Sequence, residues 1–152
     1  MTATPFKAYD IRGRVPDELN ADLARRIGHA FVATQQARTV LIGHDVRLES
    51  PELSEALARG LMEAGADVID IGLCGTEEVY FGTFHHGTDG GIMITASHNP
   101  KGWNGMKLVG RGSVPISGES GLNAIRDAVT EPQGDATAST GQEAPPSSTT
   151  RA

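Results

Sequence analysis

The sequence GGIMITASHNPKGWNGMK, from Gly90 to Lys107, contains a short apolar run that is followed at once by polar residues. Residues 92–94 are apolar and stand between turn residues, a pattern typical of a strand covered on both faces. In open α/β sheets, ligands bind at the carboxyl ends of such strands, which makes Ser97 well placed for chemistry. Because Ser, Asn and Pro are also common turn residues, residues 97–100 are equally typical of a plain turn. The segment after them is expected to bring Lys107 back to the sheet.

Upstream of this stretch, hydrophobic periodicity predicts alternating helices and strands. Asn20 is a good N-cap for a helix. Ser50 is expected to cap a second helix, with Pro51 at its first position and Gly65 ending it in the left-handed conformation. The expected strands cover residues 39–43, 67–72 and 92–94, and the expected helices cover residues 20–36, 50–64, 77–86 and 118–130.

This order of elements predicts an α/β fold over residues 1–130, a mostly parallel mixed sheet with helices on both faces. From residue 131 to 152 the character changes: twelve of the 22 residues are Gly, Pro, Ser or Thr, and large apolar residues are absent. Such a segment buries too little apolar surface to offset the entropy of ordering it. The sequence therefore predicts one domain followed by a disordered C-terminal tail.

Composition narrows the class of protein. A net charge of −6 argues against a nucleic-acid partner, because binding phosphate backbones normally needs a clustered basic face. No apolar run approaches the roughly 20 residues that span a bilayer, so we expect no membrane partner. The first residues lack the apolar core of a signal peptide, and the single Cys74 cannot form an internal disulfide. These features fit a cytoplasmic protein.

The N-terminal stretch FKAYDIRG, residues 6–13, predicts a strand that ends in a glycine turn carrying Arg12. Two interpretations of Arg12 are open. It is either a surface cation paired with Asp10 or Glu18, or a clamp for phosphate, to which a planar guanidinium is suited.

Several common chemistries are not supported by the spacing of the residues. Ser97 lacks the flanking glycines of a nucleophile elbow, and His98 is adjacent to it, so the two side chains point apart on an extended backbone. The sequence contains neither the phosphate-binding loop Gly-x4-Gly-Lys-Ser/Thr nor a Gly-x-Gly-x-x-Gly motif after a predicted strand. His85 and His86 are adjacent rather than four residues apart, which disfavours a metal site on that helix. The polar residues that remain are Ser97, His98, Asn99, Lys107 and Arg12. This set of one hydroxyl, two polar side chains and two cations suits phosphoryl transfer.

Several motifs together resemble the α-D-phosphohexomutases, and among them the bacterial phosphomannomutase/phosphoglucomutase branch. TASHNP at residues 95–100, with NGMK at 104–107, resembles the active-site serine loop of that superfamily. YDIRG at residues 9–13 resembles its N-terminal motif, and SPEL at 50–53 and DIGLCGT at 70–76 add support. The motifs occur in the expected order over about residues 5–130.

The resemblance implies a role for each matching position. Ser97 would be the phosphorylated serine that exchanges its phosphoryl group with a hexose phosphate through a hexose 1,6-bisphosphate, and its phosphate would also give one oxygen to Mg²⁺. Lys107 would be a general acid and base, with Arg12 beside the phosphoserine. His98 and Asn99 would shape the loop and contact substrate or phosphate, and Tyr9 would contact substrate.

The sequence departs from the family in two respects. His44 stands where related sequences often have arginine. More important, family members have four domains, and this sequence matches only the first. The Asp-Gly-Asp-x-Asp motif that supplies the other Mg²⁺ ligands is absent, as are the sugar-reading and C-terminal phosphate-binding segments. The missing mutase domains are therefore expected partners if they are encoded separately.

Three hypotheses follow. The chain is the N-terminal domain of a phosphomannomutase/phosphoglucomutase that interconverts hexose 1- and 6-phosphates, with phosphoglucosamine mutase as a near alternative. In the second hypothesis the chain is a truncated, non-catalytic fragment. In the third it is a module that binds a phosphosugar or a protein partner. By the argument from missing domains, we expect the chain alone to be a poor mutase.

Overall fold

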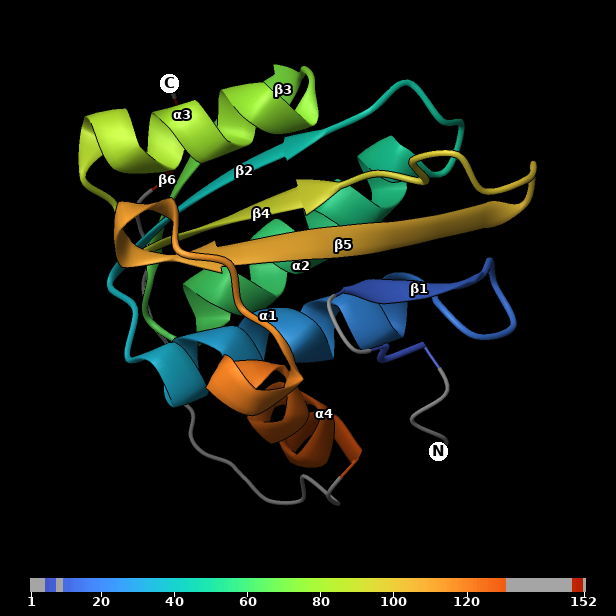
Figure 1. Cartoon of the computed structure of the whole chain (residues 1–152), viewed down its shortest axis with the longest axis horizontal. Helices are drawn as coiled ribbons and strands as arrows, with labels where there is room; N and C mark the ends of the chain where they lie inside the picture. Colours follow the sequence, from blue (N-terminus) through green and yellow to red (C-terminus); the bar gives the residue numbers. More distant parts are fainter. Residues whose placement is uncertain (1–4, 8–9, 131–148, 152) are drawn as a thin grey trace.

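A mixed β-sheet forms the middle layer of the molecule, with helices on each side of it (Figure 1). The computed structural model describes residues 5–7, 10–130 and 149–151. Within them, the spatial order of the strands is β1-β5-β4-β2-β3-β6. The strands are β1 (Ile11–Arg14), β2 (Thr39–His44), β3 (Asp67–Leu73), β4 (Gly90–Ile94), β5 (Trp103–Gly110) and β6 (Thr149–Arg151).

The pairing confirms the predicted mostly parallel mixed sheet. Strand β2 runs parallel to both β4 and β3, and β3 is parallel to β6. Strand β5 is antiparallel to β4 on one side and to β1 on the other. The stretch from Gly90 to Lys107 therefore turns back on itself, and Lys107 lies opposite Met93.

Helices cover both faces of the sheet, as predicted. On one face lie α1 (Ala21–Gln35) and α2 (Ser50–Glu63), with α4 (Asn123–Thr130) packed against α1. The other face is covered by α3 (Thr76–His86). A short 3-10 turn, η1 (Arg111–Ser113), follows β5, and a π-helical turn, η2 (Gly118–Leu122), precedes α4.

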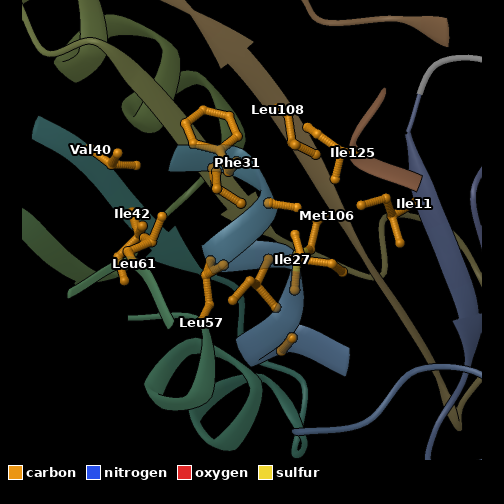
Figure 2. Packing of buried hydrophobic residues seen from close by; sticks show 14 of the residues in the cluster. Ile11, Ile27, Phe31, Val40, Ile42, Leu57, Leu61, Met106, Leu108 and Ile125 are labelled. Atoms are coloured by element: carbon orange, nitrogen blue, oxygen red, sulfur yellow. The ribbon is translucent and has the colours of Figure 1, made fainter. Parts of the chain in front are cut away.

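Two apolar clusters hold these layers together. The larger one joins the sheet to α1, α2 and α4, with Phe31, Ile42 and Met106 among its fully buried members (Figure 2). The smaller one places Leu41 and Met93 against Val79 of α3. All five residues of β4 are buried, as expected for a strand covered on both faces.

Two of the predicted helix ends are confirmed in detail. The Asn20 side chain accepts a hydrogen bond from the Leu23 amide at 2.9 Å, which satisfies one of the free N–H groups at the start of α1. At the end of α2, Gly65 has φ +104°, a conformation that favours glycine.

Three local predictions differ from the structure. The first strand begins at Ile11, so Arg12 lies within β1 and not on a glycine turn; before it, the Lys7 amide donates to the Asp10 carbonyl. Ser50 is the first residue of α2 rather than its cap, because its hydroxyl donates to Asp45. The closing helix over 118–130 starts with a π-turn, where Gly121 has φ +146°.

The predicted tail, residues 131–152, lies outside the described residues except for β6. There the β-branched Thr149 and Thr150 pair with β3, so that β6 is the outermost strand on that side, and this pairing requires backbone hydrogen bonds but no apolar core. In the described part of the chain, none of the helices combines the length and the apolarity that crossing a membrane requires. Helix α3 exposes two large aromatic side chains, Phe81 at 64% and Phe84 at 67%.

Candidate active site

Ser97 lies in the loop that follows β4, and its backbone adopts an unusual conformation. Its φ is +52°, in the left-handed region that non-glycine residues seldom enter. The Ser97 amide donates to the Thr95 hydroxyl at 2.9 Å, while the residue as a whole is exposed. The loop thus presents a hydroxyl to solvent from a backbone that its surroundings must hold in place.

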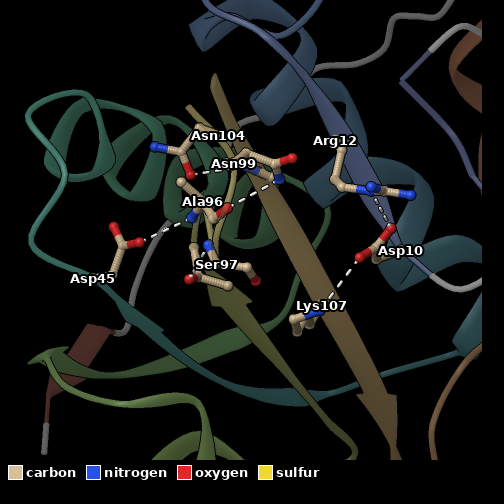
Figure 3. A network of polar contacts seen from close by, with 10 residues as sticks. Asp10, Arg12, Asp45, Ala96, Ser97, Asn99, Asn104 and Lys107 are labelled. Atoms are coloured by element: carbon tan, nitrogen blue, oxygen red, sulfur yellow. Dashed lines mark hydrogen bonds and ion pairs between the residues drawn. The ribbon is translucent and has the colours of Figure 1, made fainter. Parts of the chain in front are cut away.

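Asp45 holds the first half of this loop. It follows β2, and its amide donates to the Ile94 carbonyl at the end of β4. Its carboxylate accepts the Ala96 amide on Oδ2 at 2.9 Å (Figure 3). It also accepts the Ser50 hydroxyl and the Arg47 amide on Oδ1. Burial raises the pKa of the Asp45 carboxyl, but the hydrogen bonds from Ser50, Ala96, Arg47 and Thr95 outweigh it and hold this pKa below its usual value.

Arg47 holds the second half. Its guanidinium donates to the Pro100 carbonyl at 2.9 Å and also to the Asn99 carbonyl. Asn99 is tied inward, because its side-chain amide and its backbone amide both donate to the Ala96 carbonyl. Asn99 therefore closes a turn within the loop, and its predicted role toward substrate stays a prediction. His98 is exposed and makes no hydrogen bond to another described residue.

A buried chain of hydrogen bonds connects the loop to strand β5. The Ser50 hydroxyl accepts from the Asn104 side chain at 2.9 Å, and Asn104 is fully buried. The side-chain oxygen Oδ1 of Asn104 in turn accepts the Gly105 amide at 2.8 Å. Asp45 therefore connects to the strand that carries Lys107 through side chains that water does not reach.

The two predicted cations lie on neighbouring strands and share one carboxylate. Lys107 Nζ donates to Asp10 Oδ2 at 3.3 Å, and Arg12 Nε donates to Asp10 Oδ1 at 3.1 Å. The Arg12, Lys107 and Asp10 side chains are 45%, 33% and 16% exposed. Arg12 is thus paired with Asp10, as one interpretation held, and it also stands beside Lys107, where a phosphate clamp would need it.

Gly105 allows these strands to approach. It pairs with Arg12 of β1, and a β-carbon at this position would lie 2.2 Å from the Ile11 carbonyl oxygen. The Gly105 carbonyl also accepts the Thr95 amide at 2.9 Å, just where the serine loop begins. The start of the serine loop at Thr95 is therefore level with Gly105 of β5 and Arg12 of β1, and Lys107 lies two residues farther along β5, opposite Met93 (Figure 3).

The cations point to the face of the sheet that α3 covers in part. On β5 the neighbours of Lys107, Met106 and Leu108, are buried in the larger cluster on the opposite face. Tyr80 of α3 lies on this side, packed against the smaller cluster, and burial together with the nearby charge of Asp10 raises its pKa. Tyr9, predicted to contact substrate, lies outside the described residues.

The predicted site residues Ser97, Asn99, Arg12 and Lys107 thus lie toward the same end of the sheet, the one at which β4 ends. The sequence analysis assigned no role to Asp45, Arg47 or Tyr80. The first two had a sequence signal, since they follow the apolar strand at residues 39–43 just as Ser97 follows the strand at 92–94. Tyr80 had none, because a half-buried aromatic residue on a helix is typical of ordinary core packing.

The described residues do not fit a complete Mg²⁺ site. No group of three or more His, Cys, Asp or Glu side chains comes together in the ranges that the structure describes. The two carboxylates nearest the serine loop, Asp45 and Asp10, already accept hydrogen bonds from protein groups. A hard cation that takes six or more oxygen ligands would find too few of them here.

Comparison with known proteins places this geometry in context. Residues 3–134 match the family model described as phosphoglucomutase/phosphomannomutase, alpha/beta/alpha domain I. A phosphomannomutase of Klebsiella pneumoniae is 58% identical over 130 residues, which cover 86% of this chain and 83% of that protein. Phosphohexose mutases of Xanthomonas campestris are 64% identical over 129 residues, 85% of this chain and 29% of theirs.

The fold has relatives among solved structures. The crystal structure of a phosphoglucomutase/phosphomannomutase family protein from Burkholderia thailandensis superposes with a TM-score of 0.76 at 40% identity. The match covers 85% of this chain and 30% of that one. The chain therefore spans under a third of the length of the Xanthomonas and Burkholderia relatives.

Proposed function

Because the chain belongs to the phosphoglucomutase/phosphomannomutase family as its α/β/α domain I, we propose that it supplies the phosphoserine half of a phosphohexomutase active site. Ser97 accepts a phosphoryl group from a hexose bisphosphate and returns it to a hexose monophosphate. The whole enzyme would then interconvert hexose 1-phosphate and hexose 6-phosphate. The observation that carries the proposal is the exposed Ser97 on a loop that starts level with Arg12, at the end of the strand that pairs with Lys107.

The chemistry assigns a task to each group. The bond between phosphorus and a sugar oxygen breaks, a bond between phosphorus and Ser97 Oγ forms, and the serine proton leaves while the sugar oxygen gains one. Lys107 moves these protons, and Arg12 stabilises the transferred oxygens with a planar guanidinium. An arriving phosphoryl group competes with Asp10 for both cations. Its oxygens need only replace the Asp10 carboxylate in two partly exposed ion pairs, those with Arg12 and Lys107.

The remaining parts of the proposal concern what lies beyond this chain. Mg²⁺ binding to the serine phosphate would need carboxylates from elsewhere, and other mutase domains are the proposed partners. The choice among mannose, glucose and glucosamine phosphates would be made there too. A second candidate is a module that binds a phosphosugar without catalysis. It is favoured by Arg12 and Lys107, two cations suited to a phosphate, in described ranges that hold no group of three metal-ligating side chains.

Intact-mass measurement of the 152-residue chain tests the proposal. The chain is incubated with glucose 1,6-bisphosphate and Mg²⁺, and we expect the added mass of one phosphoryl group, located at Ser97 by peptide mapping. Ser97→Ala should abolish the gain, whereas Ser120→Ala, which changes an exposed serine of η2, should keep it. A folded wild-type chain that binds the bisphosphate but never gains the mass would favour the binding module instead.

A further inference from the structure

We propose that Asp45 and Arg47 are positioning residues that hold Ser97 in the conformation from which it accepts a phosphoryl group. The inference rests on the proposed function for its catalytic consequence. Its structural part, that these two side chains fix the serine loop, stands on the hydrogen bonds alone. We call the pair the loop brace.

The brace holds the loop on both sides of Ser97. Asp45 accepts the amide of Ala96, the residue before Ser97, and Arg47 donates to the carbonyls of Asn99 and Pro100, just after it. Ser97 itself has φ +52°, which an unsupported non-glycine residue would leave for a commoner region of backbone conformation. Releasing either end therefore allows the Ser97 hydroxyl to move from the position in which the loop now presents it.

The brace is itself rigidly supported. The Arg47 amide donates to Asp45 Oδ1 at 3.1 Å, so the two residues form one short turn after β2. Asp45 is also bound by the Ser50 hydroxyl at 2.5 Å, and Ser50 is bound by buried Asn104 of β5. The same hydrogen-bond chain thus reaches the serine loop and the strand that carries Lys107, which sets one relative to the other.

These residues act through the loop and not on the substrate. Both oxygens of Asp45 already accept hydrogen bonds, and two guanidinium nitrogens of Arg47 are directed at backbone carbonyls. Loss of the brace should consequently slow phosphoryl transfer to Ser97 without removing the nucleophile or either cation.

The test compares brace variants with matched variants at the other end of the sheet. Asp89 accepts the backbone amides of Arg38 and Thr39, and Arg111 donates to the carbonyls of Gln35 and Gln36, so this pair has the same bonding but no contact with the serine loop. The variants are Asp45→Asn, Arg47→Ala and Arg47→Lys, with Asp89→Asn and Arg111→Ala as controls.

The first measurement is the initial rate of Ser97 phosphorylation by glucose 1,6-bisphosphate. We expect Asp45→Asn and Arg47→Ala to lower this rate by about tenfold or more, as loss of hydrogen bonds to a charged group would. Arg47→Lys should recover part of the rate, because an ammonium can still donate to one carbonyl. The controls should stay within about twofold. Brace variants at the wild-type rate, or controls that lose as much, would overturn the proposal.

Amide hydrogen exchange at residues 96–99 separates this inference from the proposed function. If the wild-type chain accepts no phosphoryl group, the proposed function fails, but the brace is still decided. Exchange at these amides should speed up in Asp45→Asn and Arg47→Ala and stay unchanged in Asp89→Asn. Unchanged exchange in the brace variants would refute the structural part as well.

Discussion

The two ends of the central strands β2 and β4 are fastened by nearly identical sets of contacts. At the carboxyl end, the Asp45 amide donates to Ile94, and its carboxylate accepts two backbone amides and one side chain. At the amino end, the Asp89 amide donates to Thr39, and its carboxylate likewise accepts two backbone amides and the side chain of Arg111. Arg47 and Arg111 each donate to two successive carbonyls.

The two ends differ in burial and in what they hold. Asp45 is bound by buried Ser50, which is bound in turn by buried Asn104, whereas the partners Arg38 and Arg111 of Asp89 are exposed. The amino-end pair fastens the end of α1 to the start of two strands. The carboxyl-end pair holds a loop with an exposed hydroxyl and a left-handed backbone. One bonding pattern thus serves packing at one end and a candidate active site at the other.

Replacing each acid with alanine should break this similarity most strongly. Asp45→Ala leaves the buried Ser50 and the Ala96 amide without an acceptor, and we expect a loss of about 2–4 kcal/mol in the free energy of unfolding. Asp89→Ala exposes its former partners to water, which can replace the lost bonds, so we expect about 1 kcal/mol. Urea unfolding of both variants measures the difference. Equal losses would mean that burial does not distinguish the two ends.

The pH dependence of stability should sharpen the comparison. Burial raises the pKa of Asp89, but hydrogen bonds from the Arg38 and Thr39 amides and the charge of Arg111 outweigh it, so this pKa is lowered, as is that of Asp45. A lowered folded-state pKa contributes stability that is complete above the unfolded value, about 3.9, and is lost as pH falls through the folded value.

Asp45→Asn and Asp89→Asn should therefore each flatten the acid limb of the stability profile. We expect the gap between wild type and each variant to be widest near neutral pH and to narrow below about pH 4. Thermal unfolding from neutral pH down to acid checks this. A gap that keeps its size throughout would show that ionised carboxylates are not its source.

The smallest effect is expected at the third acid. Asp10 pairs with Arg12 and Lys107, which are both partly exposed, so Asp10→Asn should change the free energy of unfolding by less than about 1 kcal/mol. Raising the salt to about 1 M should remove most of that change by screening. The Asp45→Asn loss should resist salt, because its hydrogen bonds are mostly part-buried. A salt-insensitive Asp10→Asn effect would contradict this contrast.

Much of the fold could be predicted from local patterns. The apolar run at residues 92–94 and the Asn20 cap both correspond to observed elements, because each depends on residues within a few positions. The prediction was wrong where a distant partner competes for a local signal. Ser50 looks like a helix cap, but its hydroxyl is bound to Asp45 and Asn104.

The candidate site shows the same division. Ser97, Lys107 and Arg12 were predicted by their chemical types and by the family motifs. Asp45 and Arg47 received no role, because their partners in the serine loop lie 51 to 53 positions away and no local pattern indicates that pairing. The family resemblance was confirmed by the family match over residues 3–134, whereas the individual catalytic roles stay predictions.

By itself the sequence determined the alternation of helices and strands, the covered central strand and the chemical groups available to the site. Only the tertiary structure decided that Asp10 meets Lys107 from 97 residues away and that Asp45 closes the serine loop. The physical reason is range: periodicity, capping and turn preference act within a few residues, whereas strand order and register are set by packing and by hydrogen bonds between distant segments.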